Sequence, residues 1–329
     1  MIKIALIDSG INRESTVSKH RILSGITFDS KLDVIYSSEE FDDNGHGTFC
    51  ANVILSRTTL SVIRPIKILN SQLKSNSELL IAALKILLDS DINIVNLSLS
   101  TSNPQYSDEI EMICNELYES GKIIVASYDN GGAISYPASF KNVLGVKGRF
   151  MNDASEYWFN GEDVIADYTP IMRQISNEKK CLAGGNSKAT ALITSYIASI
   201  WESDPNQSKE DVLKSFQVRA KKDKWSTEEY TQLSYPYAKQ EIDNRLSENE
   251  KRLLLDTIDQ FKNIKFEQGN AITQPLFICG LTKDNCFDLA YRLQEAYKVD
   301  LHVNEMNYKS FYSVANLSYV IGDAINEKT

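Results

Sequence analysis

Long apolar runs and clusters of basic residues are both absent from this sequence. The longest mostly apolar stretch, Leu79 to Leu88, is interrupted by Lys85 and is far too short to cross a lipid bilayer. The formal net charge of −9 at pH 7, without any basic run, argues against a surface that binds nucleic acid. We therefore expect neither a membrane nor a nucleic acid among the partners, and 42% apolar residues are enough to build a core.

Cysteine is also scarce. The five cysteines are an odd number, scattered along the chain, which favours reduced thiols over a disulfide framework. They are Cys50, Cys114, Cys181, Cys279 and Cys286. Reduced thiols are typical of the cytosol, so the sequence predicts a cytoplasmic protein.

One of only three histidines, His46, lies between two glycines in the stretch Asn44 to Thr48. Histidine exchanges protons near neutral pH, and glycine neighbours let backbone and substrate approach it closely. An exposed turn with an incidental histidine would contain the same residues. The motif alone therefore leaves a general base and a plain turn as alternatives.

Two further segments place a carboxylate and a hydroxyl at the ends of regular elements. The apolar run Ile2 to Ile7 predicts a buried parallel strand that ends at Asp8, where open α/β sheets hold their functional groups. A pair of glycines precedes Ser187, and the apolar segment after it predicts a helix that begins near this serine. Asp8, His46 and Ser187 therefore form a candidate catalytic set in that chain order.

An aspartate, a histidine and a serine are the parts of a serine hydrolase. The hydroxyl attacks only when the histidine takes its proton, while the carboxylate fixes the tautomer of the ring. The segments Asp8 to Gly10, Asn44 to Thr48 and Gly185 to Ala191 resemble the three catalytic motifs of the subtilisin family of serine peptidases. The resemblance implies an α/β fold, with helices on both faces of a parallel sheet, and an acyl-enzyme mechanism in which these three residues are catalytic.

Two other segments resemble the family's oxyanion hole and its substrate strand. By the resemblance of Ile123 to Gly132, Asn130 donates from its side chain to the negative oxygen of the tetrahedral intermediate. An ordinary Asn-Gly turn is the alternative for this asparagine. The segment that resembles the strand pairing with the substrate backbone consists of Ser98, Leu99, Ser100 and Thr101. The alternative there is the plain end of a strand.

Several positions depart from the family pattern. Asn186 and Ala191 stand where the family usually has threonine and proline, on either side of the candidate nucleophile. The glycines that line the family's primary specificity pocket correspond here to Ser100, Thr101 and Asp129. A carboxylate on that wall favours a basic side chain at P1, or it only narrows the pocket. We therefore count Asp129 among the candidate substrate-binding residues.

No metal and no other cofactor is expected. The stretch from Cys50 to Leu69 is short compared with family members that carry a calcium-binding loop, and it contains no carboxylate to supply oxygen ligands. Cys50 follows His46 by four residues, which also fits a Cys-His nucleophile pair. Packing along one helical turn is the interpretation that we prefer, because Ser187 already has the family context.

The peptidase resemblance ends before the chain does. Asp211 to Ala220 resembles the helix that closes subtilisin domains, so we predict a peptidase domain at 1–222. A polar stretch at 223–245 predicts a linker, and 246–329 forms a second unit. In that unit Ser247 to Glu250 is a capping box that opens an amphipathic helix. The apolar positions expected on one face of this helix are Leu253, Leu254, Ile258 and Phe261.

The second unit resembles an acyl or peptidyl carrier protein. Gly280 to Tyr297 follows that family's attachment motif and the helix after it, within a small predicted all-α bundle. Lys283 replaces the attachment serine and cannot form the phosphodiester to phosphopantetheine, so we expect no prosthetic group. A generic helical bundle without carrier ancestry is the alternative.

Because Met1 lies only seven residues before Asp8, we expect neither a signal peptide nor a folding propeptide. We expect an intracellular serine endopeptidase with a narrow target, such as leader removal or maturation of a modified precursor peptide. Residues 246–329 would guide it to a substrate or a biosynthetic partner. The alternative is a catalytically silent, subtilisin-like protein that binds peptides. A serine esterase or transpeptidase is a third reading of the same residues.

Overall fold

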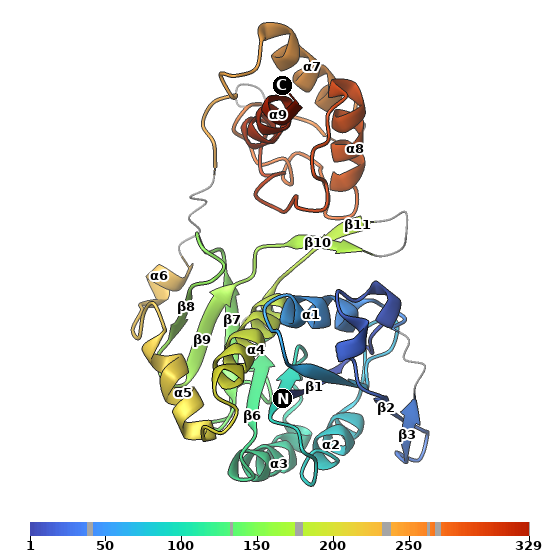
Figure 1. Ribbon diagram of the computed structural model, residues 1–329, viewed down its shortest axis with the longest axis vertical. Coiled ribbons are helices and arrows are strands. Elements are labelled where there is room, and N and C mark those ends of the chain that lie inside the picture. Colours follow the sequence, from blue (N-terminus) through green and yellow to red (C-terminus); the bar gives the residue numbers. More distant parts are fainter. Residues whose placement is uncertain are drawn as a thin grey trace. The chain divides into compact units, whose positions relative to one another are not determined.

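The protein forms two compact units (Figure 1). The first consists of Met1–Tyr168 and Gly185–Gln232, and the second of Thr169–Gly184 and Leu233–Thr329. The computed structural model describes residues 1–37, 42–131, 134–174, 180–231, 238–261, 264–266 and 271–328. Within these ranges, no helix combines the length and the apolar character that a membrane span requires.

A single large sheet forms the centre of the first unit. Across the described residues its nine strands follow the order β3-β2-β4-β1-β5-β6-β7-β9-β8. Their bounds are β1 Lys3–Asp8, β2 Gly25–Phe28, β3 Val34–Ser37, β4 Val62–Lys67, β5 Ile94–Leu97, β6 Ile123–Ser127, β7 Leu144–Arg149, β8 Tyr157–Phe159 and β9 Asp163–Asp167. Only the edge strands β3 and β8 are antiparallel to their neighbours, so the central strands all end at the same edge.

The central strands β1, β5 and β6 are almost continuously apolar and buried. Such runs are typical of parallel strands whose two faces are both covered. In β1, Ala5 and Ile7 pack in a core that includes Leu80 and Ile113 from helices on one face. Because successive side chains point to opposite faces, the neighbouring Ile4 and Leu6 turn toward the other face.

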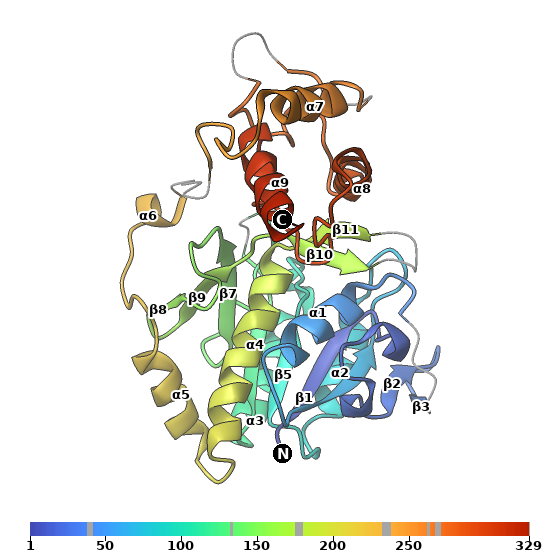
Figure 2. The same cartoon turned by 45° about the horizontal axis from the view of Figure 1, so that its top comes forward.

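Helices cover both faces of this sheet (Figures 1 and 2). Helices α2 and α3 pack on one face, whereas α1 and α4 contact each other and the strands on the other face. The bounds in this unit are α1 His46–Leu55, α2 Ser77–Lys85, α3 Ser107–Glu119, α4 Asn186–Ser203, α5 Lys209–Val218 and α6 Thr227–Thr231, with short 3-10 turns at Arg13–Ser15, Lys19–Arg21 and Pro104–Tyr106. This arrangement confirms the predicted α/β architecture.

The described residues of the second unit form three helices and a two-stranded hairpin. They are α7 Glu248–Asp259, α8 Cys286–Tyr297, α9 Val314–Lys328, β10 Ile171–Gln174 and β11 Lys180–Ala183. Helix α7 begins with the predicted capping box, in which Ser247 and Glu250 each accept a backbone hydrogen bond from the other. Leu254 and Ile258 are buried as predicted, but Leu253 is 37% exposed. Adjacent residues point about 100° apart on a helix, so the two leucines do not face the core together.

The regular elements described within 246–329 are all helices, as predicted, and the hairpin joins them from an earlier part of the chain. It comes from within 1–222, yet Met172 and Leu182 pack in the core of the second unit. The backbone N–H of Leu182 donates to the carbonyl of Lys283 at 2.9 Å, which ties β11 to the segment before α8. The domain boundaries at 222 and 246 stay predictions, and they would assign this hairpin to the peptidase domain.

Part of the expected linker is folded onto the first unit. Helix α6 lies within 223–245, and Trp225 and Tyr230 pack against a small core that contains Trp158. Residues 232–237, including Pro236 of the linker, and Gly132 of the oxyanion motif lie outside the described residues.

Candidate active site

Asp8 is the last residue of the central strand β1 and is fully buried. Its position follows from the parallel sheet, because β1 ends between β4 and β5 at the edge where the other central strands also end. The N–H of Ser9 donates to Asp8 Oδ1 at 2.7 Å. This contact and the surrounding strands hold the carboxylate in one orientation.

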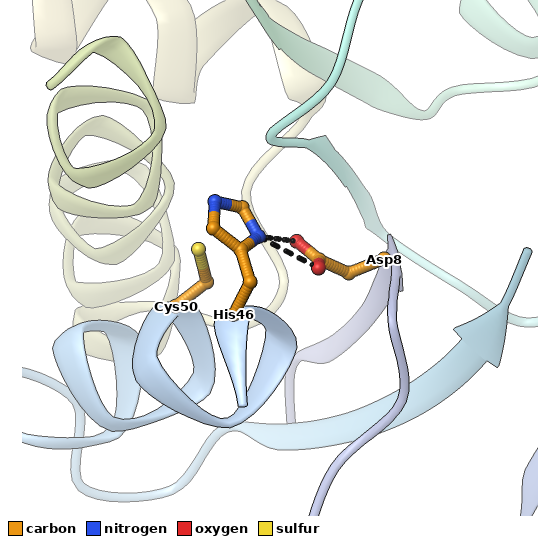
Figure 3. Close-up of side chains that lie close together, drawn as sticks. All are labelled: Asp8, His46 and Cys50. Carbon is orange, nitrogen blue, oxygen red and sulfur yellow. Dashed lines mark hydrogen bonds and ion pairs between the residues drawn. The ribbon is translucent and has the colours of Figure 1, made fainter. Parts of the chain in front are cut away.

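His46 is the first residue of α1 and points at Asp8 (Figure 3). Its Nδ1 lies 2.8 Å from Asp8 Oδ1 and 3.0 Å from Oδ2. A neutral histidine that donates from Nδ1 to a carboxylate carries its lone pair on Nε2, which is the tautomer that a general base requires. The structure therefore brings together the first two predicted residues.

Gly47 lets α1 approach the end of β1. A Cβ at this position would lie 2.1 Å from the carbonyl oxygen of Gly10 and 3.2 Å from Asp8 Cβ. No side chain fits at such distances. The glycine after His46 is thus required for the contact between the histidine helix and the aspartate strand.

Asp42 organises the start of α1 and was not singled out from the sequence. Its Oδ1 accepts from the N–H of Gly45 at 2.6 Å, and its Oδ2 accepts from the N–H of Thr48 at 2.9 Å. It also accepts from Ser9 Oγ at 2.7 Å, which links it to the residue after Asp8. Aspartate commonly accepts hydrogen bonds from the backbone of the turn that follows it, and this turn signal was available in the sequence.

Ser187 is the second residue of α4 and is half-buried. Its hydroxyl donates to the carbonyl of Ser98 at 3.2 Å, and the hydroxyl of Ser98 donates to the carbonyl of Ser187 at 3.2 Å. Helices α1 and α4 contact each other, so His46 and Ser187 both stand in the first turn of packed helices. A helix N-terminus also favours negative charge that develops near it.

Asn130 lies in the loop that follows β6, as its motif predicts, and its side chain is exposed. Its Oδ1 accepts a hydrogen bond from the N–H of Asn186 at 3.2 Å. Because the oxygen is used in this contact, the Nδ2 group is the part of the amide that offers donors. Gly185 has φ of +90°, and a Cβ there would lie 3.2 Å from Asn130 Oδ1.

The segment from Ser98 to Thr101 leaves the sheet beside Ser187. Thr101 pairs with Tyr136 through two backbone hydrogen bonds of 2.9 and 2.8 Å. Leu99 and Ser100 are half-buried and make no backbone hydrogen bond with the part of the chain that the structure describes. Their peptide groups are therefore available to an added strand.

Asp129 forms a local turn next to Asn130. Its Oδ2 accepts from the N–H of Gly131 at 2.8 Å, and its own N–H donates to Ser135 Oγ at 2.9 Å. Asp129 is exposed. The structure gives its position in the loop after β6, and its effect on P1 preference stays a prediction.

The residue after Ser187, Lys188, forms a buried ion pair with Asp167. The sequence analysis did not predict this pair. Lys188 Nζ is 2.5 Å from Asp167 Oδ2, and the two side chains are only 3% and 2% exposed. Asp167 ends β9 and also accepts from the N–H of Met151 at 3.2 Å. A lysine in an otherwise apolar helix start was the available signal, but its partner is more than twenty positions away.

Among the described residues, one group of side chains has ligand atoms close enough to hold a metal ion. One ligand atom each from Asp8, His46 and Cys50 lies within 4.8 Å of the others (Figure 3). Cys50 is buried one turn along α1 from His46. A metal ion on these atoms would compete with the hydrogen bond from His46 to Asp8, so this set fits proton transfer better than metal binding.

The chain matches a model of the subtilase family, peptidase S8, over residues 1–269. It is 28% identical over 222 residues to the minor extracellular protease Epr of Bacillus subtilis (strain 168), covering 63% of this chain and 33% of that protein. It is 25% identical over 221 residues to subtilisin Savinase of Lederbergia lenta, covering 63% of this chain and 78% of that protein. The chain thus spans only a third of the length of Epr.

Solved structures of similar proteins give the same result for the fold. Sphericase matches with a TM-score of 0.56 and 21% identity, over 67% of this chain and 83% of that one. A cold-adapted subtilisin-like serine proteinase matches with a TM-score of 0.57 and 17% identity, over 69% and 84% of the two chains. The predicted subtilisin-like α/β fold is confirmed.

Proposed function

This chain belongs to the subtilase family, and from that premise we propose that it is a serine endopeptidase acting through an acyl-enzyme. The observation that carries the proposal is the contact of His46 Nδ1 with both carboxylate oxygens of the buried Asp8. Ser187 lies in the first turn of a helix that packs against the helix of His46. This is the set of groups that acyl transfer requires.

The proposed reaction begins when the hydroxyl of Ser187 turns from the carbonyl of Ser98 toward His46 Nε2. The imidazole takes the hydroxyl proton while Oγ forms a bond to the substrate carbonyl carbon. Asp8 stabilises the imidazolium that results. His46 then gives the proton to the leaving amine as the C–N bond breaks, and a water molecule hydrolyses the acyl-enzyme by the same steps.

Asn130 is the proposed side-chain donor to the oxyanion. The tetrahedral intermediate places a negative charge on the former carbonyl oxygen, and a fixed amide donor stabilises this charge. The contact of Asn130 Oδ1 with the backbone N–H of Asn186 supports this role, because it leaves Nδ2 available beside Ser187.

Substrate binding is proposed to use the extended segment from Ser98 to Thr101. The available peptide groups of Leu99 and Ser100 support pairing with the substrate backbone, which gives affinity that depends little on the substrate sequence. Asp129, exposed on the neighbouring loop, supports a preference for a basic side chain at P1. A peptide library that shows no gain for lysine or arginine at P1 would remove this preference.

The finer proposal is a cytoplasmic peptidase that matures a specific precursor peptide. Five buried cysteine thiols support a reducing compartment. The second unit is proposed to recognise the precursor or a biosynthetic partner, as a carrier-like bundle without its prosthetic group. The exposed Lys283 at the position of the attachment serine supports that reading. Incubation with candidate precursors and mass spectrometry tests it, and the absence of any cleavage would contradict it.

Labelling with a fluorophosphonate probe tests the catalytic proposal. An activated serine forms a covalent bond with the probe, so the wild-type chain should label and a Ser187→Ala variant should not. A chain that binds peptides but does not label would instead support the silent peptide-binding alternative. Partition of the acyl-enzyme between water and added amines separates a peptidase from a transpeptidase.

A further inference from the structure

Asn186 is the residue immediately before Ser187 and the first residue of α4. Its side chain is only 7% exposed. A buried amide must have its donors and acceptor satisfied, so its partners define where the start of the helix can lie. Those partners come from two other elements of the first unit.

The side chain of Asn186 joins the loop after β6 to the strand β7. Its Nδ2 donates to the carbonyl of Tyr128 at 2.9 Å and to the carbonyl of Asp129 at 3.3 Å. Its Oδ1 accepts from the N–H of Gly148 in β7 at 2.8 Å. Both carbonyls belong to the two residues that directly precede Asn130.

The backbone of Asn186 completes the connection. Its N–H donates to Asn130 Oδ1 at 3.2 Å. One residue therefore binds the side chain of Asn130 and the two peptide groups that lead to it. Any shift of the nucleophile relative to the loop has to break or stretch these hydrogen bonds together.

The surroundings of Asn186 are fixed at several points. A Cβ on Gly148 would lie 2.9 Å from Asn186 Oδ1 and 2.5 Å from Tyr168 Cβ, so only glycine permits this approach. The hydroxyl of Tyr128 donates to Asp163 Oδ1 at 2.9 Å. Burial, with the nearby Asp163, raises the pKa of Tyr128 to about 12, so the phenol keeps its proton as a donor at neutral pH.

We propose that Asn186 is a positioning residue that holds the oxyanion donor Asn130 in register with Ser187. The inference rests on the proposed function, because it assigns Asn130 to the oxyanion. Asn130 is exposed on a loop, and without these bonds its side chain would sample other orientations. A donor that is displaced by about 1 Å stabilises the transition state much less, with losses of up to roughly 10²-fold in rate.

The test is a double-mutant cycle on the full chain with four proteins: wild type, Asn130→Ala, Asn186→Leu and the double variant. Leucine has the same number and branching of side-chain heavy atoms as asparagine, and it removes the hydrogen bonds of the side chain without adding a charge. Asn142→Leu is the matched control. Asn142 also donates from Nδ2, to Asn115 Oδ1 at 2.8 Å. It precedes the amino-terminal end of β7, whereas the candidate site lies at the carboxyl ends of the strands. The readout is the second-order rate of fluorophosphonate labelling, and thermal unfolding checks that each variant is folded.

We expect Asn130→Ala to slow labelling about 10²- to 10³-fold. Asn186→Leu should slow it about 10- to 10²-fold, and the control should stay within about twofold of the wild type. In the Asn130→Ala background the Asn186→Leu change should have almost no further effect, because the donor that it positions is gone. Full multiplication of the two losses, or wild-type labelling by Asn186→Leu, would overturn the proposal.

A crystal structure of Asn186→Leu gives a readout that does not depend on activity. The proposal predicts that Asn130 leaves its contact with the backbone N–H of residue 186, and an unmoved Asn130 would contradict it. Asn186→Ala replaces the leucine variant if the latter does not fold. A wild-type chain that fails to label would refute the proposed function, whereas the structural comparison would still decide the role of Asn186.

Discussion

The two compact units bury different kinds of side chain. The first unit buries charged and amide groups around its candidate site, including Asp8, Asp167 and Lys188. The core of the second unit is aliphatic and aromatic, with Phe287 and Phe311 in edge contact at its centre. Buried charges are costly unless they are paired, and among the described residues the first unit buries more of them than the second, which buries Asp243. The difference teaches that the arrangement near Ser187 is maintained by specific polar contacts rather than by apolar packing alone.

The second unit also takes a hairpin from the sequence that leads to the nucleophile. Its strand β11 ends at Ala183, four residues before Ser187. At the base of the hairpin, the N–H of Gly185 donates to the carbonyl of Tyr168 at 3.1 Å. This bond closes the loop within the first unit. Removal of 246–329 would therefore expose the hairpin as well, and point variants compare the units more cleanly.

The largest effect is expected from exchanging a buried carboxylate in each unit. Asp8→Asn should lower the labelling rate about 10⁴-fold, because the amide no longer holds His46 in the required tautomer. Asp243 is equally buried in the second unit and pairs with Arg245. Asp243→Asn should destabilise that unit and leave labelling within about twofold of the wild type. Equal losses of labelling would show that buried carboxylates act only through folding.

The next effect concerns the buried ion pair behind Ser187. Lys188→Met should lower the free energy of unfolding by about 3–5 kcal/mol, because it removes the ion-pair partner of the buried Asp167. A Lys188→Met, Asp167→Leu double variant should regain most of this loss. The free energy of unfolding is measured in urea, with tryptophan fluorescence as the signal. This signal reports on the first unit, because Trp158, Trp201 and Trp225 all lie there.

An exposed ion pair is the control for this experiment. Lys85 and Glu109 lie 2.8 Å apart with side chains 54% and 45% exposed. Lys85→Met should cost about 0–1 kcal/mol. A comparable loss at both pairs would contradict the idea that burial gives the Lys188 pair its importance.

A smaller effect is expected from the core of the second unit. Leu182→Ala and Leu254→Ala each remove a buried side chain and should destabilise this unit by about 2–5 kcal/mol. Hydrogen exchange of peptides from α8, measured by mass spectrometry, reports the change. Because the hairpin is closed at Gly185, labelling should stay unchanged in both variants. Slower labelling in Leu182→Ala alone would show that the second unit controls the nucleophile.

The smallest effects have opposite pH dependence in the two units. Burial acts to raise the pKa of Glu202, but hydrogen bonds from Ser61, Thr59 and Leu60 outweigh it and hold this pKa below its ordinary value. This contribution to the stability of the first unit is present above the pKa of unfolded glutamate and is lost as the pH falls through the lower, folded value. The measurement is the urea midpoint of unfolding, detected by tryptophan fluorescence, as a function of pH. In Glu202→Gln this midpoint should fall less at acid pH than it does in the wild type.

In the second unit, His302 gives the stability the opposite dependence on pH. The hydrogen bond to Glu327, aided by Asp300, raises the pKa of His302 above its ordinary value. Its contribution is complete below the pKa of unfolded histidine and is lost as the pH rises through the folded value. The measurement is the protection of α9 against hydrogen exchange as a function of pH, after correction for intrinsic exchange rates. In His302→Gln this protection should fall less between neutral and basic pH than it does in the wild type. A slope of the same sign in both units would contradict this assignment.

Much of the candidate site was predictable because its signals are local. The apolar run before Asp8, the glycines around His46 and the glycines before Ser187 each predict how a single element begins or ends. Asp42 has a similarly local signal, because it forms a turn with the residues directly after it. The hairpin β10–β11 gave no comparable pattern, since its strands are short and lack regular alternation of apolar residues.

The sequence by itself determined the family, the parallel α/β architecture and the elements that carry Asp8, His46, Asn130 and Ser187. Each of these depends on residues that are neighbours along the chain. Only the tertiary structure decided that Asn186 binds the loop before Asn130, that Lys188 pairs with Asp167, and that the hairpin packs in the second unit. These contacts join residues between 21 and 101 positions apart, and the geometry that joins them exists only after the sheet and the second core have formed.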